Sequence, residues 1–210
     1  MNGSSAIPPA WLAEISHRLS GGARILLGLA GTPGSGKSSL AEALHAAFPG
    51  VSVIVPMDGF HLANVELARL SRAERKGAPD TFDAGGYTAL LRRIHNAAPD
   101  ETIYAPLFRR EIEEPIAGAI PVLPAHRLVI TEGNYLLAGG AWAGVRPLLD
   151  TCWFVDIAAE TRVERLIARH MHFGRSAAAA REWVLRSDEK NARFIEETRA
   201  SADRLVNWPA

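Results

Sequence analysis

Residues 31–38 read Gly31-Thr32-Pro33-Gly34-Ser35-Gly36-Lys37-Ser38, and Ser39 follows them. The octapeptide matches G-x-x-x-x-G-K-S, the pattern of a loop that cradles a polyphosphate. Its glycines let the backbone turn N–H groups inward, and the N-terminus of a following helix adds unpaired donors and a positive dipole end. Lys37 supplies a mobile charge for the β- and γ-phosphates, and the Ser38 hydroxyl is placed to ligate Mg²⁺. The stretch therefore predicts a site for a polyphosphate and its magnesium ion.

The segments on either side of this loop agree with that interpretation. Residues 25–30 form an apolar run with the length and composition of a buried parallel strand. Residues 38–48 carry apolar side chains at helical spacing and stop at Pro49-Gly50. Strand, glycine loop and helix thus follow in the order that phosphate binding requires, which argues against a chance match.

Length and composition limit the class of protein. The chain has 210 residues, which predicts one domain over 1–210, and its Lys+Arg and Asp+Glu totals are equal at 23 each. This balance disfavours nucleic acid and anionic membranes as partners. Cys152 is the single cysteine, lies in an apolar run and is expected in the core; no intrachain disulfide is possible. Without a signal-peptide pattern or an apolar run of membrane-spanning length, we expect a cytoplasmic protein.

The rest of the chain alternates apolar strands with helical patterns. This order predicts an α/β fold: a three-layer sandwich whose parallel sheet of about five strands has helices on both faces. Besides the strand at 25–30, we expect strands at 51–56, 127–132, 151–157 and 204–208. We expect helices at 7–22, 63–76, 84–97, 160–173 and 177–200, and a loop or hairpin at 104–115.

Two carboxylates follow apolar runs, where open α/β sheets place their active sites. Asp58 comes just after residues 51–56 and is the leading candidate for a general base towards a substrate hydroxyl; the alternative is a turn or capping aspartate. Glu132 ends residues 128–131 in a Walker-B-like pattern. Beside a phosphate-binding loop it is expected to hold Mg²⁺, directly or through water, rather than to be a structural carboxylate.

Other polar residues allow two interpretations each. His61 either touches substrate or forms a hydrogen bond within its loop. Asp83 either caps the helix at 84–97, which its spacing favours, or holds a polyol or ribose hydroxyl. Arg109 and its neighbour Arg110 either bind substrate or pair with the nearby glutamates.

A cluster of arginines predicts a small lid at about residues 165–180. Arg165 and Arg169 lie four apart on one helical face, and Arg175 follows the glycine stop at Gly174. Arginines on a closing lid stabilise the charge that concentrates on a moving phosphoryl group. The alternative is a solvated arginine face.

Six motifs in order resemble one known group. They are GTPGSGKSS at 31–39, PMDGFHL at 56–62, RKGAPDTFD at 75–83, the segment 108–115, VITEGNYLL at 129–137 and RHMHFGRS at 169–176. Together they resemble the uridine kinase, phosphoribulokinase and bacterial pantothenate kinase branch of the P-loop kinases. Within it the chain is most similar to the small bacterial kinases labelled fructose-transport-system or nucleoside kinases. The resemblance covers nearly the whole chain from about residue 8 and implies the P-loop NTPase fold.

The resemblance implies ATP and Mg²⁺ at Lys37 and Ser38, with Glu132 as the Walker B acid. It also implies that Asp58 is the catalytic carboxylate, that Asp83 holds sugar hydroxyls, and that lid arginines assist. By residue, the expected catalytic set is Asp58, Lys37, Arg169 and Arg175, and the expected acceptor-binding set is Asp58, His61, Asp83, Arg109 and Glu132.

Departures from the family pattern bear on the substrate. The chain lacks the extended substrate and coenzyme A regions of pantothenate kinases, and Phe108-Arg109-Arg110 replaces the histidine-bearing loop of uridine kinases. We therefore expect a Mg·ATP-dependent kinase of a small alcohol, with a sugar such as fructose favoured over uridine, cytidine or pantothenate. Dimers are common among relatives, so a homodimer is one possibility.

A nucleotide-hydrolysing switch is the alternative from another class. Residues 83–86 fit the D-x-x-G of GTPases, but no N-K-x-D sequence for guanine recognition occurs in the chain. A degenerate nucleotide-binding module is expected to lose Lys37, Asp58 or Glu132, and all three are present. The sequence therefore favours a kinase.

Overall fold

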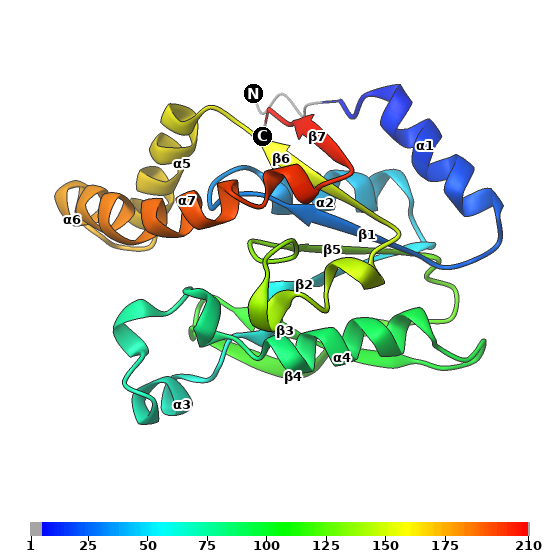
Figure 1. Ribbon diagram of the computed structural model, residues 1–210, viewed down its shortest axis with the longest axis horizontal. Coiled ribbons are helices and arrows are strands. Elements are labelled where there is room, and N and C mark those ends of the chain that lie inside the picture. The colour runs from blue at the N-terminus through cyan, green and yellow to red at the C-terminus, as the bar shows by residue number, and fades with distance from the viewer. Residues whose placement is uncertain (1–5, 210) are drawn as a thin grey trace.

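The computed structural model describes residues 6–209, and within them a parallel sheet forms the centre of the molecule (Figure 1). Its strands are ordered β2-β5-β1-β6-β7. The bounds are Ile25–Ala30 for β1, Ser52–Pro56 for β2, Leu128–Gly133 for β5, Thr151–Asp156 for β6 and Arg204–Asn207 for β7. Every residue of β1 and β5 is buried, which explains why these strands read as continuous apolar runs. The predicted five-stranded parallel sheet is confirmed.

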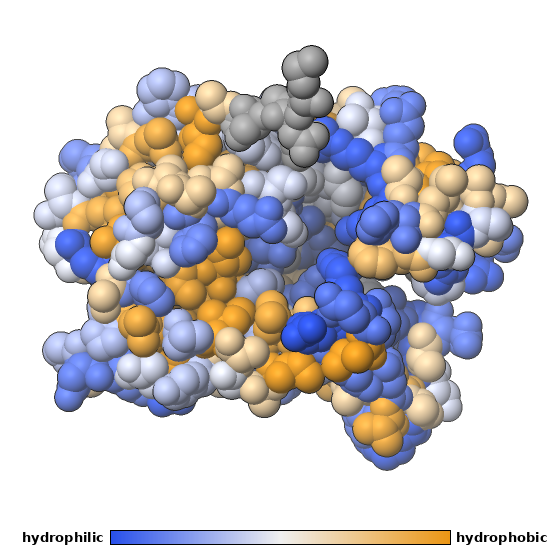
Figure 2. Space-filling view, turned by 180° about the vertical axis from the view of Figure 1, so that it is seen from behind, coloured by the Kyte–Doolittle hydropathy of each residue, from blue (hydrophilic) through white to orange (hydrophobic). Residues whose placement is uncertain are grey.

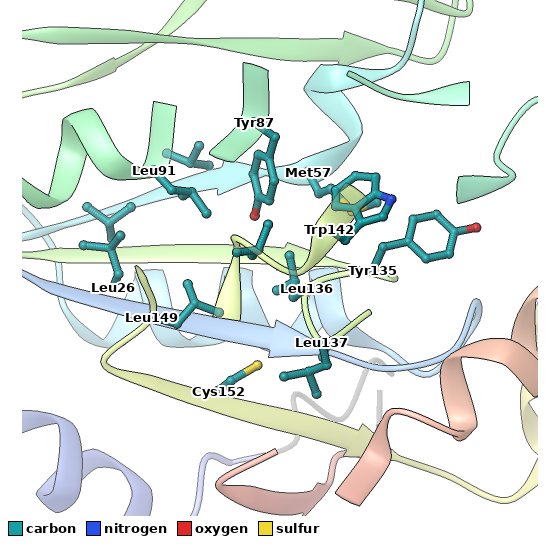
Figure 3. Close-up of a cluster of buried hydrophobic side chains, with 14 of the residues drawn as sticks. Leu26, Met57, Tyr87, Leu91, Tyr135, Leu136, Leu137, Trp142, Leu149 and Cys152 are labelled. Carbon is teal, nitrogen blue, oxygen red and sulfur yellow. The ribbon is translucent and has the colours of Figure 1, made fainter. Parts of the chain in front are cut away.

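Alternate residues of the strands face two separate cores. On one face, Leu27 and Leu29 pack with α1 (Pro9–Ser20) and α2 (Lys37–Ala47). On the other, Leu26 packs with α4 (Ala84–His95) and the segment after β5; Figure 3 shows Tyr87, Tyr135 and Trp142 gathered there. Cys152 is fully buried in this second core. Because helices cover both faces, the fold is the three-layer α/β sandwich that the sequence predicts.

A hairpin forms a second, two-stranded sheet over residues predicted as a loop or hairpin. It pairs β3 (Ile103–Arg109) with β4 (Glu114–Val122) in antiparallel register, with an irregularity between Ala105 and Leu107. The hairpin packs against the short 3₁₀ helix η1 (Met57–Phe60) that follows β2. It therefore extends the wall of the molecule at the carboxyl ends of the strands.

The expected helix at 63–76 is wrong in its length. The helix α3 covers only Asn64–Arg69, and a separate 3₁₀ turn covers Ala73–Arg75. Ser71, between them, has φ 55°, a left-handed conformation that ends an α-helix. The remaining short 3₁₀ helices are η3 Pro79–Thr81, η4 Gly140–Trp142, η5 Arg146–Leu148 and η7 Arg199–Ser201.

The C-terminal helices lie together beside the carboxyl ends of the strands (Figure 1). They are α5 (Ala159–His172), α6 (Ala177–Trp183) and α7 (Glu189–Glu196). The single helix expected at 177–200 is wrong, because the π-helical segment η6 (Val184–Asp188) interrupts it and α7 ends at Glu196. A π turn widens the helix locally and rotates the face presented after it, and such turns are frequent at functional sites.

Of the helices within residues 6–209, none is both long enough and apolar enough to cross a bilayer.

Candidate active site

The glycine loop takes its shape from three left-handed glycines. Gly31, Gly34 and Gly36 have φ values of 151°, 81° and 97°, which side-chain-bearing residues rarely adopt. Gly34 also packs against α5, where an added Cβ would lie 2.9 Å from Leu166 Cγ and 3.0 Å from the backbone oxygen of Arg162. The loop is therefore seated directly on the first helix of the predicted lid.

Lys37 and Ser38 begin α2 and face inward. The Lys37 side chain is buried, and its Nζ donates to the backbone oxygen of Thr32 at 3.0 Å. Burial lowers the pKa of Lys37 to about 8, while the negative charges of Glu132 and Asp58 oppose the shift. The Ser38 hydroxyl donates to Glu132 Oε1 at 3.0 Å. These side chains therefore sit together at the mouth of the loop.

Glu132 and Asp58 are brought together by the pairing of β5 with β2. Pro56 lies opposite Glu132 in the register, so η1 places Asp58 directly beyond that point. Burial and the nearby charge of Asp58 raise the pKa of Glu132, whereas Lys37 lowers it. A carboxylate from β5 and one from η1 thus both act on the charge of Lys37.

A magnesium ion fits this arrangement only with help from the nucleotide. Among the described residues, no group of three or more His, Cys, Asp or Glu side chains could hold a metal by itself. Mg²⁺ commonly binds through one or two protein oxygens plus phosphates and water. The hydroxyl of Ser38 and the carboxylate of Glu132, 3.0 Å apart, are oxygen donors of the required kind.

The loop and both carboxylates line one cavity of about 820 Å³. Its walls come from the glycine loop, η1, the β3–β4 hairpin and the C-terminal helices. In the space-filling view the molecule is hollowed between two lobes, with hydrophilic residues on the rim (Figure 2). The cavity has the volume of a small-molecule site and joins a phosphate-binding end to an end lined by the hairpin.

Lid arginines enter this cavity from α5 and the segment beyond it. Arg165, Arg169 and Arg175 all line it, as the lid hypothesis predicts. Arg169 lies on the exposed side of α5, and loss of solvent around its guanidinium, followed by the charge of Arg110, lowers its pKa. Arg175 lies over the ring of Trp183, 4.2 Å from its centroid. The structure thus places cations around the space where a phosphoryl group would move.

Asp83 lies outside the cavity lining. Its side chain accepts a hydrogen bond from the backbone N–H of Gly86 at 2.8 Å and caps α4. The capping interpretation that its spacing favours is therefore confirmed. The contact with sugar hydroxyls that the family resemblance implies stays a prediction. The capping hydrogen bond directs the Asp83 carboxylate towards the first turn of α4.

Arg109 is also displaced from the expected site. It ends β3, is exposed, and pairs with Glu111 at 3.1 Å. The next residue, Arg110, lies in the hairpin turn, lines the cavity and reaches Asp58 Oδ2 at 3.4 Å. Of the two adjacent arginines, it is therefore Arg110 and not the expected Arg109 that lines the cavity, because the turn decides which of the two side chains faces inward.

Several cavity residues were not anticipated. Trp183, Asp188 and Asn191 line it from the segment that includes the π turn, and Asp188 bonds His170 Nε2 at 3.0 Å. No local motif in the sequence marks these residues as part of a site. Regular helical spacing does not predict that they share one face, because the π turn changes the face that the helix presents after residue 184.

Comparisons with known proteins agree with this geometry. The model of the Phosphoribulokinase / Uridine kinase family matches residues 26–208. A provisionally named uridine kinase of Schizosaccharomyces pombe is 36% identical over 200 residues, which cover 87% of this chain and 83% of that protein. The pantothenate kinase of Mycolicibacterium vanbaalenii is 29% identical over 73% of this chain but only 50% of its own length.

A solved structure is similar over most of the chain. It is that of a provisionally named fructose transport system kinase from Silicibacter sp. TM1040, with a TM-score of 0.81 and 38% identity. The match covers 89% of this chain and 90% of that one. Sequence and fold therefore point to the same group of proteins.

Proposed function

The chain belongs to the phosphoribulokinase / uridine kinase family and is a kinase, and on that premise we propose that it phosphorylates a sugar-like alcohol such as fructose with Mg·ATP. The observation that supports this most directly is the shared cavity. Asp58 lies at its acceptor end and Lys37, Ser38 and Glu132 at its phosphate end. A kinase needs its acceptor site and its phosphate site in one continuous cavity, so that the acceptor hydroxyl can approach the terminal phosphate.

In the proposed reaction Asp58 orients the acceptor hydroxyl and takes its proton. The hydroxyl oxygen forms a bond to the γ-phosphorus as the bond to the β–γ bridging oxygen breaks, and ADP leaves with that electron pair. Lys37 and the lid residues Arg169 and Arg175 line the same cavity. In the proposed reaction their positive charges stabilise the transferring phosphoryl group. Ser38 and Glu132 would hold Mg²⁺, which neutralises phosphate charge when bound.

Closure of the lid would favour transfer to the alcohol over transfer to water. Arg165 and Arg169 come from the same helix that contacts Gly34 of the phosphate loop. A nucleotide bound at the loop would therefore touch the lid as well, and closure would exclude water from the γ-phosphate.

The test is ADP release with Mg·ATP against a panel of alcohols. The panel contains fructose and other ketoses, uridine, cytidine, pantothenate and ribulose 5-phosphate. The proposal expects one sugar to raise the rate well above the basal hydrolysis. Asp58→Asn should then lower kcat by about 10²–10⁴-fold while ATP affinity stays within about threefold. Wild-type turnover by this variant would refute the role of Asp58.

The same panel decides between the proposed acceptor and its rivals. The 36% identical relative named for uridine supports a nucleoside kinase as the second candidate. Stimulation by uridine or cytidine alone would select it, and stimulation by pantothenate would select the third. If no alcohol raised the rate and Asp58→Asn hydrolysed ATP like the wild type, a nucleotide-driven switch would replace the kinase reaction in this proposal.

A further inference from the structure

The acceptor end of the cavity contains a column of stacked rings. His61 lies between Phe82 and Phe108, with ring centroids 4.0 Å and 4.5 Å away, and all three residues line the cavity. The imidazole plane is tilted by 41° to one phenyl ring and by 38° to the other. At these distances no further ring fits between the two phenyl groups, because the imidazole already occupies that space.

The column is held from both sides. An isolated antiparallel bridge pairs the backbone of His61 with that of Phe82. Phe82 is only 7% exposed and meets the Trp142 ring edge-on at 5.7 Å. At the other end, Lys76 Nζ lies over the ring of Phe108, 5.1 Å from its centroid. The surrounding structure therefore sets the position of the imidazole.

One ring nitrogen of His61 is already engaged. Nδ1 lies 2.8 Å from the backbone oxygen of Asp58, and a carbonyl can only accept, so Nδ1 carries a proton. Burial lowers the pKa of His61, which keeps the ring neutral near pH 7. Nε2 is then a hydrogen-bond acceptor, and it makes no hydrogen bond with any residue in the range 6–209. The ring therefore offers the cavity one acceptor for an O–H group.

The charges around the column are balanced. Arg110 reaches Asp58 at 3.4 Å, and Lys76 lies 3.8 Å from Glu113, so each cation has an acidic neighbour. All four side chains line the cavity. An acceptor with a phosphate or carboxylate would have to separate one of these pairs, whereas an uncharged acceptor would not.

We infer that His61 determines acceptor specificity by filling the slot between Phe82 and Phe108 that a planar base would enter, and by accepting a hydrogen bond from a second hydroxyl of an uncharged polyhydroxylated acceptor. This inference rests on the proposed function and narrows its substrate class. It excludes nucleosides on steric grounds and requires a hydroxyl beside the one that is phosphorylated.

Two substitutions separate the two roles. His61→Phe keeps a flat ring in the slot but has no Nε2, so it should raise KM for the best sugar about tenfold, with kcat and the KM for ATP within about twofold. Nucleosides should still be rejected. His61→Ala removes both ring and acceptor; it should show the same loss and, in addition, bind uracil in a calorimetric titration. Added imidazole should restore sugar KM in His61→Ala and have no effect on His61→Phe.

Several outcomes would overturn the inference. An unchanged sugar KM in His61→Phe would show that Nε2 accepts nothing from the acceptor. Failure of His61→Ala to bind uracil or respond to imidazole, in protein that still binds ATP, would show that the ring blocks no slot. If the wild-type protein phosphorylated uridine as efficiently as the best sugar, this would also show that the His61 ring does not exclude a base. If no alcohol stimulates the wild type, the proposed function fails, and the uracil titration still decides whether His61 closes the slot.

Discussion

Single side chains decide which charges face the hairpin end of the cavity, where we propose that the acceptor binds. Arg109 and Arg110 are adjacent in sequence and identical in chemistry, yet only Arg110 faces the cavity and reaches Asp58. The difference comes from the hairpin turn that follows β3. Because the two residues differ in position alone, they form a natural pair of test and control.

Arg110→Ala should lower kcat/KM for the acceptor by about tenfold, because Arg110 holds the Asp58 carboxylate and adds positive charge beside the transferring phosphoryl. Arg109→Ala removes an exposed pair with Glu111 and should leave kcat/KM within about twofold. Steady-state kinetics with the best acceptor compares the two variants. Equal effects would show that position in the turn is irrelevant.

His61 also makes stability depend on pH. Its pKa in the folded chain lies below the ordinary value of 6.5 because of burial; Lys76 and Arg110 lower it further, and Asp58 opposes them. Between the two values the unfolded chain binds more protons, so the unfolding free energy falls as pH drops below about 6.5. Urea unfolding at pH 7.5 and pH 5.5 should show a larger loss for wild type than for His61→Phe. Equal losses would contradict the assignment.

At the scale of elements, close approach of η1 to the hairpin positions Asp58. A Cβ added at Gly59 would lie 2.4 Å from the backbone oxygen of Pro106, closer than real contacts allow. The hairpin and η1 can therefore pack only if residue 59 lacks a side chain. Asp58 is the residue before Gly59, and Arg110 is the residue after β3, the strand that contains Pro106. The packing of η1 against the hairpin therefore sets the positions of Asp58 and Arg110 relative to each other.

Gly59→Ala should destabilise the fold by about 1–3 kcal/mol and raise the acceptor KM, because the hairpin must move away from η1. Gly139→Ala is the matched control, since a Cβ there meets nothing within 4 Å and its φ of −81° suits alanine. The control should stay within about 0.5 kcal/mol of wild type. Denaturant unfolding and kinetics measure both; a harmless Gly59→Ala would refute the packing argument.

At the scale of the whole molecule, the phosphate loop and the C-terminal helices form one connected unit. Gly34 packs on α5 at Arg162 and Leu166, and the buried Arg162 bonds Glu189 of α7 at 2.5 Å. A change at the loop therefore reaches α7 through direct contacts.

Binding of a non-hydrolysable ATP analogue with Mg²⁺ should slow amide hydrogen exchange over residues 31–39 and 159–196. The reason is that the loop donors and the lid arginines line the same cavity. Helix α1 contributes no residue to the cavity lining and should be unchanged, which makes it the internal control. Chelation of Mg²⁺ should abolish most of the effect. Protection confined to 31–39 would show that the lid does not respond to the nucleotide.

Much of this protein is readable from local sequence patterns. Continuous short runs of buried residues mark β1 and β5, the glycines at 31, 34 and 36 mark the phosphate loop, and acidic residues after apolar runs mark Asp58 and Glu132. Each of these signals lies within a few consecutive residues, and parallel pairing of the strands then brings their carboxyl ends to one edge. The sequence by itself therefore determined the α/β fold and the phosphate end of the candidate site.

Only the tertiary structure decided the acceptor end and the shape of the lid. Which of Arg109 and Arg110 faces inward depends on how the hairpin meets η1, and the enclosure of His61 depends on Phe82 and Phe108 from distant segments. The π turn at 184–188 likewise changes which side chains of a helical stretch face the cavity. These features arise from packing between segments far apart in the chain, and the local spacing of apolar residues does not predict such contacts.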